Sequence, residues 1–257
     1  MVTLDAATVL LQWATGGLAF LWVTTRRRKV GVGYGWLLRG VYGGLAATSA
    51  VLGIWVVGSV PVRDAASIGV ALACAVALVV SARRRAVPVD APGAFPPALD
   101  LVAPVIGMVG VVAGAVVASD VVWPGVSRFV VGALFLGAVS DAMLLGHWYL
   151  VQPGLPRAPL LELIRISTVL AIPEVALLLV PVGMISVLDG TIDDAYGGLL
   201  GWFWVACPLT TVGLLVVPRL ALRERQYSAV MAATGLLYLA ILVAFGTDLV
   251  ARALLAL

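Results

Sequence analysis

Long apolar runs follow one another along the whole chain, and short gaps rich in proline, glycine and charge separate them. A helix that crosses a bilayer needs about 20 mainly apolar residues. The sequence contains eight runs of roughly that length: 6–24, 34–59, 66–82, 97–119, 124–150, 160–188, 197–218 and 228–252. We therefore expect an all-α, polytopic membrane helix bundle with eight transmembrane helices. The gaps are too short to hold a soluble domain, so we expect one integral membrane domain over residues 1–257.

Composition supports this interpretation, because 62% of the residues are hydrophobic and only 11% are charged. Soluble domains carry about 25% charged residues. A chain with so much apolar surface needs the lipid bilayer as its main partner. The net charge of +3 does not indicate a nucleic-acid partner, since the basic residues lie in short gaps between apolar runs, where they orient helices.

The distribution of basic residues predicts the orientation of the helices, because cytoplasmic loops carry an excess of Lys and Arg. With the N-terminus outside, 13 of the 16 basic residues lie at inner helix ends, and only Arg63, Arg128 and Arg252 lie outside. We expect both termini outside, in the cytoplasmic membrane of a prokaryote. No basic region precedes the first apolar run, so we expect the first helix to be retained.

Acidic residues also gather on the predicted outer side. This position favours a solvated outer rim, with a cation-attracting vestibule as a second interpretation. The seven residues are Asp5, Asp64, Asp120, Asp189, Asp193, Asp194 and Asp248.

The two halves of the chain resemble each other weakly. Trp22 and Trp148, and likewise Arg39 and Arg165, are each 126 residues apart at corresponding helix ends. A 4+4 parallel pseudo-repeat, with halves 1–122 and 123–257, would match an arrangement found in transporters. Apolar helices also resemble one another by chance, so both explanations stay open.

Two helices carry closely spaced glycines, which let helix backbones approach each other in lipid. We expect tight helix packing at these positions and no ligand site. They are Gly40, Gly43, Gly44, Gly107, Gly110 and Gly114.

Glu174 is the strongest candidate for a functional residue. It falls near the middle of the predicted helix 160–188, and therefore near the bilayer midplane. Charged residues at that depth usually face the bundle interior and mark ion, proton or substrate paths. Pro173 precedes it and removes one backbone hydrogen bond, which predicts a flex point. The alternative is a protonated side chain that simply bonds a neighbouring helix.

Asp141 is the second buried acidic candidate, slightly nearer the cytoplasm than Glu174. If the two carboxyl groups are close, they could share a proton and act as a proton relay. Asp141 could equally form an ion pair with Arg165. Polar residues at comparable depth predict the lining of the site: Gln12, Thr210 and Thr211, with Pro208 as a second flex point.

His147 is the only histidine, and Trp148 and Tyr149 follow it near the inner interface. Aromatic residues at that depth form an interfacial belt. His147 could accept a proton or contact a quinone there. A haem would need a second ligand, for which Met143 or Met184 would have to be suitably placed. We expect no cofactor, with haem or quinone as the lesser alternative.

Several classes of function can be set aside. The only lysine, Lys29, lies in a gap, which excludes a retinal Schiff base in a late helix. No His-Glu-x-x-His, Cys-x-x-Cys or Gly-x-Ser-x-Gly motif is present, so we expect neither an enzyme nor a metal site. Cys74 and Cys207 lie inside apolar runs, and we interpret them as small core residues.

Two functions remain. The first is transport, or proton-coupled translocation of a small solute or ion, through a buried acidic site. The alternative is a non-catalytic membrane subunit of a respiratory or biogenesis complex that contacts quinone or haem near the inner interface. A homo-oligomer or a partner in a membrane complex is compatible with either function.

Overall fold

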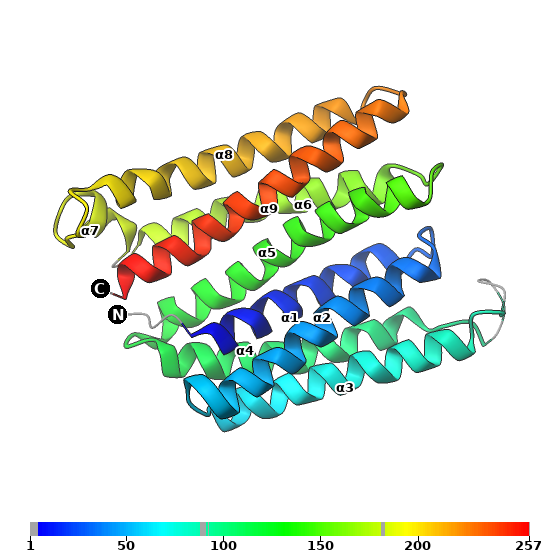
Figure 1. Ribbon diagram of the computed structural model, residues 1–257, viewed down its shortest axis with the longest axis horizontal. Helices are drawn as coiled ribbons and strands as arrows, with labels where there is room; N and C mark the ends of the chain where they lie inside the picture. Colours follow the sequence, from blue (N-terminus) through cyan, green and yellow to red (C-terminus); the bar gives the residue numbers. More distant parts are fainter. Residues whose placement is uncertain (1–4, 88–90, 92, 181–182, 257) are drawn as a thin grey trace. The chain divides into compact units, whose positions relative to one another are not determined.

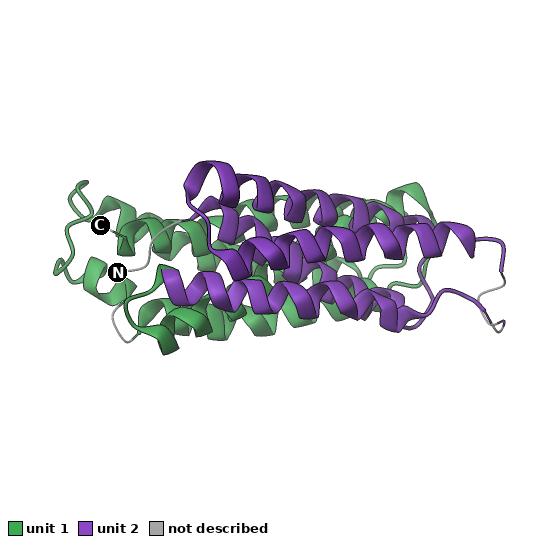
Figure 2. Cartoon of the chain, turned by 90° about the horizontal axis from the view of Figure 1, so that it is seen from below, with its two compact units in different colours: residues 1–4, 118–257 green, residues 5–117 purple. Residues whose placement is uncertain are grey.

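The computed structural model describes residues 5–87, 91, 93–180 and 183–256, and every regular element in these residues is a helix (Figure 1). The helices form two compact units (Figure 2). The N-terminal unit comprises residues 5–117, and the C-terminal unit comprises the chain from residue 118 onward.

The N-terminal unit contains four long helices, three of which pack in chain order, α1 against α2 and α2 against α3. A π-helical turn, η1 (Gly53–Val57), continues α2, and a 3-10 turn, η2 (Pro97–Leu101), leads into α4. The helices are α1 (Ala6–Thr25), α2 (Val32–Leu52), α3 (Pro61–Arg83) and α4 (Val102–Ala118).

Local sequence signals fix the ends of these helices. The Asp5 side chain caps α1 and accepts a hydrogen bond of 3.0 Å from the backbone N–H of Ala7. Pro61 opens α3, where its missing N–H has no partner to lose. Gly58 makes the turn between η1 and α3 with a φ of 104°, a conformation that favours glycine.

The C-terminal unit is a bundle of four long helices with a short helix at one end (Figure 1). Helix α5 packs against α6 and α9, and α8 packs against α6 and α9, so the four long helices enclose a common interior. The elements are α5 (Val122–Val151), α6 (Ala158–Leu179), α7 (Met184–Leu188), α8 (Leu199–Ala221) and α9 (Tyr227–Leu255).

The predicted single helix 160–188 is wrong, because α6 ends at Leu179 and α7 is a separate element. Val180 has an extended conformation, with φ −129° and ψ 157°. It precedes Pro181 in the sequence, and proline disfavours helical geometry in the residue before it. Glu174 therefore lies five residues from the end of a 22-residue helix, about 8 Å from that end, rather than at the midpoint.

Among the described residues, seven helices are long and apolar enough to cross a membrane, which indicates an integral membrane protein. The expected eighth span corresponds to α6. Its 22 residues measure about 33 Å, which matches the hydrocarbon thickness, but it carries three charged residues, Glu162, Arg165 and Glu174. Helix α3 begins at Pro61, five residues before the predicted start at residue 66. The additional first turn contains Arg63 and Asp64, which are buried as an ion pair.

Candidate functional site

Glu174 lies in the interior of the C-terminal unit with only 1% of its surface exposed. Its electrostatic partners are Asp248, Arg252 and Arg128. We call these four residues the charged cluster: Arg128 comes from α5, Glu174 from α6, and Asp248 and Arg252 from α9. All four are at least 93% buried, so the cluster is shielded from solvent and bulk lipid alike.

Arg252 and Asp248 form an ion pair within α9. They are one helical turn apart, and the Arg252 Nε donates to Asp248 Oδ1 over 2.8 Å. The Arg252 guanidinium also lies over the Phe129 ring, 4.0 Å from the centroid. This stacking holds the cation in place through an aromatic face as well as a carboxylate.

Arg128 binds the end of α6. Its Nε donates to the Leu177 carbonyl over 2.7 Å, and its Nη2 donates to the Val180 carbonyl over 3.4 Å. The last carbonyls of a helix lack donors within the helix, and the helix C-terminus favours a positive charge. The early end of α6 therefore creates the acceptors that hold Arg128 inside the bundle.

Glu174 differs in its bonding from Asp64 and Asp248, whose carboxylates accept hydrogen bonds. Neither carboxylate oxygen accepts a hydrogen bond from an N–H or O–H group among the described residues. The Asp248 carboxyl group lies within hydrogen-bonding reach of Glu174. A hydrogen bond between two carboxyl groups requires a proton on one of them. The pair is therefore a candidate proton-binding site.

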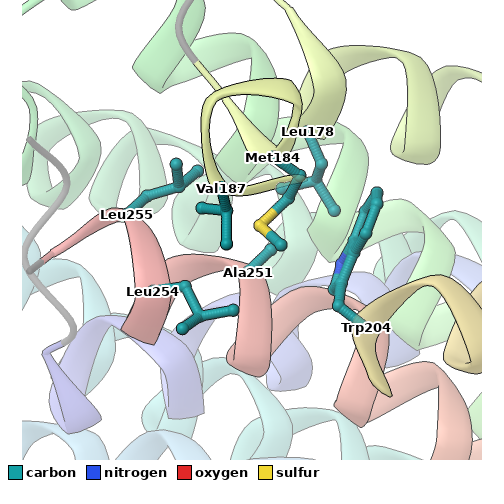
Figure 3. Packing of buried hydrophobic residues seen from close by; sticks show 7 residues of the cluster. All are labelled: Leu178, Met184, Val187, Trp204, Ala251, Leu254 and Leu255. Carbon is teal, nitrogen blue, oxygen red and sulfur yellow. The ribbon is translucent and has the colours of Figure 1, made fainter. Parts of the chain in front are cut away.

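An apolar cluster joins α6, α7, α8 and α9 (Figure 3), and two of its members lie close in sequence to residues of the charged cluster. Leu178 lies one turn beyond Glu174 in α6, and Ala251 precedes Arg252 in α9. The Trp204 indole donates to the Thr247 carbonyl over 2.9 Å, which ties α8 to α9 beside Asp248. The buried members are Leu178, Met184, Val187, Trp204, Ala251, Leu254 and Leu255.

The N-terminal unit contains a comparable group around Arg63 with saturated hydrogen bonding. Arg63 Nε donates to Asp64 Oδ1 over 2.9 Å, and its guanidinium also pairs with Asp5. Asp64 Oδ2 accepts from the Ser59 hydroxyl over 2.7 Å and the Val60 N–H over 3.0 Å. A buried ionic group whose acceptors are all engaged is typical of a structural role.

Asp141 is fully buried in α5 but at a different depth from Glu174. It is 13 residues beyond Arg128, which corresponds to about 20 Å along the helix, whereas Arg128 contacts the end of α6 near Glu174. The acidic neighbour of Glu174 is therefore Asp248. Arg165, the other partner considered for Asp141, is exposed.

The predicted lining residues are scattered. Thr210 faces the outer surface of α8, and the Thr211 hydroxyl donates to the Cys207 carbonyl of its own helix over 2.9 Å. Gln12 belongs to the N-terminal unit, where its amide is buried without a hydrogen-bond partner among the described residues. Pro173 and Pro208 both lie inside continuous helices, α6 and α8.

The aromatic residues near His147 secure the turn between α5 and α6. The Tyr149 hydroxyl donates to the Pro156 carbonyl over 2.7 Å, and the Trp148 indole donates to Gln152 over 3.1 Å. His147 is half-buried and meets Tyr238 edge-on, with ring centroids 6.1 Å apart. Met184 belongs to the apolar cluster at the opposite end of the unit, so it cannot share a haem with His147.

The acidic outer rim was predicted wrongly for Asp64, Asp194 and Asp248, which are all at least 96% buried. Sequence reasoning placed Asp248, Arg128 and Arg252 outside because they lie near helix ends. The spacing of Asp248 and Arg252, one turn apart in an apolar helix, was the available signal of a buried pair.

Within the residues that the structure describes, no group of three His, Cys, Asp or Glu side chains is placed to hold a metal ion. Comparison of the chain with protein-family models, with curated proteins and with solved structures gives no match.

Proposed function

We propose that this integral membrane protein carries out transport or proton-coupled translocation of a small solute or ion, and that Glu174 and Asp248 form its proton-binding site. The observation that carries the proposal is the Glu174 carboxyl group, which is buried beside a second carboxyl group and accepts from no N–H or O–H donor in the part of the chain that the structure describes. Ionisable residues inside membrane helices commonly mark proton and substrate paths.

The charges around Glu174 support a proton that can be bound and released. Arg128 donates a hydrogen bond to a carbonyl of α6. Arg252 donates a hydrogen bond to Asp248 and stacks on the Phe129 ring. Both cations therefore keep acceptors whether Glu174 is charged or neutral. Loss of a proton from the carboxyl pair leaves two negative charges beside two arginines, and binding of a proton leaves a carboxyl-to-carboxyl hydrogen bond.

The surroundings of the cluster support controlled access. Pro173 cannot donate to the Val169 carbonyl, which weakens the backbone ladder of α6 one residue before Glu174. The short helix α7 contributes Met184 and Val187 to the apolar cluster. Movement of a short segment over a polar site is a common way to expose it to one side at a time.

Proton flux in proteoliposomes tests the proposal. The purified protein is reconstituted in vesicles that contain a pH-sensitive dye, and a potassium diffusion potential drives protons inward. We expect Glu174→Gln to abolish the protein-dependent flux, because the amide cannot release a proton. Glu162→Gln, which makes the same change in the same helix, serves as the control and retains flux. Equal flux in the wild type and Glu174→Gln would contradict the proposal.

Infrared difference spectroscopy tests the site without any knowledge of the solute. We expect a protonated carboxyl band that changes with pH in the wild type and Glu162→Gln. The band should be lost or displaced in Glu174→Gln and in Asp248→Asn, because each variant removes one half of the pair. A band that is unaltered in both variants would show that these carboxyl groups do not hold the titrating proton.

A further inference from the structure

A second polar site lies in the N-terminal unit, separate from the charged cluster. It is a cavity of about 120 Å³ between the α1–α2 turn, α2, the end of α3 and the segment before η2. We call it the arginine pocket. Its polar lining residues are Thr25, Arg28, Arg39, Ser81, Arg84 and Arg85.

The arginine pocket carries an excess of positive charge. Four arginines line it, and no carboxylate is among the described lining residues. Asp100 compensates one of the four, because it accepts from Arg39 Nε over 2.8 Å and from Arg39 Nη2 over 2.9 Å. Asp100 thus balances one guanidinium, and Arg84 and Arg85 add positive charge to the pocket wall.

Arg39 is the fixed element of the pocket. It is 3% exposed, and Asp100 and the Phe95 ring, whose centroid is 4.5 Å from the guanidinium carbon, hold it in place. Its third nitrogen, Nη1, has no acceptor among the described residues. A Cβ atom on Gly35 would lie 2.9 Å from this nitrogen, so the glycine leaves room around it.

From these observations we infer that the arginine pocket binds a phosphate group. Guanidinium groups match phosphate oxygens with parallel hydrogen bonds, which is why arginine clusters recognise phosphate. The buried Nη1 of Arg39 offers one fixed donor, and Arg84 and Arg85 are exposed at the mouth, where their side chains can close on an anion. The cavity of about 120 Å³ has room for a tetrahedral anion.

The phosphate could belong to an anionic phospholipid headgroup or to a water-soluble molecule. The pocket lies at the ends of α1 and α3, the level at which a headgroup would meet the protein. Basic pockets between membrane helices on the cytoplasmic side are known to bind anionic headgroups. The same donors would serve a soluble phosphate, so the experiment needs one arm for each source.

Charge-matched variants separate specific binding from general attraction to anions. The pocket variant Arg84→Gln/Arg85→Gln removes two lining charges. The control variant Lys29→Gln/Arg83→Gln removes two neighbouring exposed charges that do not line the pocket. Both variants change the net charge and the topology signal of the inner loops equally. Arg39 is left intact, because its loss would leave Asp100 buried without a counter-ion.

In the first arm, protein in mixed micelles of phosphatidylglycerol and phosphatidylcholine is analysed by native mass spectrometry for retained lipid. In the second arm, binding of inorganic phosphate and pyrophosphate to the protein in phosphatidylcholine nanodiscs is measured by calorimetry. We expect one arm to show binding that weakens by about tenfold or more in the pocket variant and is unchanged in the control.

Loss of phosphatidylglycerol retention assigns the phosphate to a lipid, and loss of phosphate binding assigns it to a soluble molecule. The inference is overturned if the pocket and control variants behave alike in both arms, or if the wild type binds neither probe. Gel filtration and circular dichroism establish folding of each variant. Should the double variant not fold, Arg84→Gln against Arg83→Gln gives the same comparison at exposed positions.

Discussion

At the scale of single residues, the Asp248–Arg252 pair shows how costly a buried charge becomes when its partner is lost. Both side chains are at least 98% buried. We predict that Asp248→Ala destabilises the protein by about 3–5 kcal/mol, because Arg252 loses its hydrogen-bonded carboxylate inside a buried cluster. The double variant Asp248→Leu/Arg252→Met should recover most of that loss, since an apolar pair of similar volume has no charge to desolvate.

Equilibrium unfolding in mixed micelles, followed by circular dichroism, measures both variants against the wild type. A matched exposed site provides the reference: Glu224→Ala changes an exposed acid and should shift stability by less than about 0.5 kcal/mol. If the double variant were as unstable as Asp248→Ala, the loss would come from packing around Phe129 and not from the unpaired charge.

Residue burial was predictable from the sequence only where apolar neighbours surround a charge on both sides. Glu174 and Asp141 satisfy that condition, and both are buried. Asp248 lies near a helix end, so hydropathy alone assigns it to the rim. Which helix faces which depends on contacts far apart in sequence, and this is why Asp248 could not be identified as the neighbour of Glu174.

At the scale of elements, Asp194 organises the linker between α7 and α8. Its Oδ1 accepts from the N–H of Gly198 over 2.8 Å, and its Oδ2 accepts from the N–H of Leu200 over 2.8 Å and of Gly201 over 3.2 Å. The hydrogen bond from Gly198 is the main reason that the pKa of Asp194 lies below its ordinary value. The carboxylate thus satisfies amides at the start of α8.

The lowered pKa predicts an acid-sensitive linker. A carboxyl group with a lowered folded pKa stabilises the native state fully above its unfolded pKa of about 3.9, and this contribution disappears as pH falls through the folded value. Amide hydrogen exchange at Gly198, Leu200 and Gly201, corrected for intrinsic rates, should show constant protection from neutral pH to about pH 5 and a loss below about pH 4.

Asp194→Ala should remove the protection of the same three amides already at neutral pH. Asp193→Ala is the matched control, because Asp193 is exposed and accepts from the N–H of Ala195 over 2.9 Å, outside the start of α8. Equal protection in Asp194→Ala and the wild type would mean that the helix start is held by other contacts.

The glycines of α4 and α2 differ in how closely they pack, although the sequence predicts tight packing for both. A Cβ atom on Gly110 would lie 2.6 Å from the Ala66 Cβ and 2.7 Å from a Leu11 methyl carbon. A Cβ atom on Gly44 would meet nothing within 4 Å. The packing prediction holds for Gly107, Gly110 and Gly114, and for Gly43 against Cys74, but is wrong within the chain for Gly40 and Gly44.

Gly110→Val should therefore destabilise the protein by about 1–3 kcal/mol through overpacking, with a lower thermal midpoint and a smaller monodisperse fraction. Gly44→Val introduces the same side chain into a helix at an open position and should match the wild type within error. Similar behaviour of the two variants would place the effect in helix propensity instead of packing.

Helix boundaries were largely predictable, because apolar runs and proline or glycine signals determine them locally. The main error, the run 160–188, came from counting apolar residues across Pro181 as one helix. Proline at the end of a run stops a helix through the residue before it, as the extended Val180 shows. The division of that run also places Glu174 away from the midpoint of its helix, which no count of hydropathy could reveal.

At the scale of the whole molecule, the exposed basic residues of each unit lie at one end of that unit. The three arginines assigned to the outside, Arg63, Arg128 and Arg252, are all at least 93% buried. The exposed ones all lie at the opposite helix ends: Arg27, Arg28, Lys29, Arg83, Arg84, Arg85, Arg165, Arg219, Arg223 and Arg225. This asymmetry supports the proposed orientation with both termini outside.

Whether α6 crosses the membrane decides between seven and eight spans, and cysteine labelling can answer it. Gln152, Thr191 and Glu224 are exposed and lie after α5, α7 and α8 respectively. Single cysteines are placed there in a background with Cys74→Ala and Cys207→Ala, and intact cells are treated with a membrane-impermeant maleimide. If α6 spans, we expect labelling at Thr191→Cys alone, with the other two positions labelled only after permeabilisation.

A different pattern follows if α6 does not cross, because every later loop then changes side. Thr191→Cys would be protected together with Gln152→Cys, and Glu224→Cys would be labelled in intact cells. We predict the first pattern, since α6 is about 33 Å long and buries the charge of Glu174 in the bundle, while Glu162 and Arg165 lie within its first two turns, near the interface. The second pattern would move the basic ends of α8 and α9 outside, against the charge bias of every other loop.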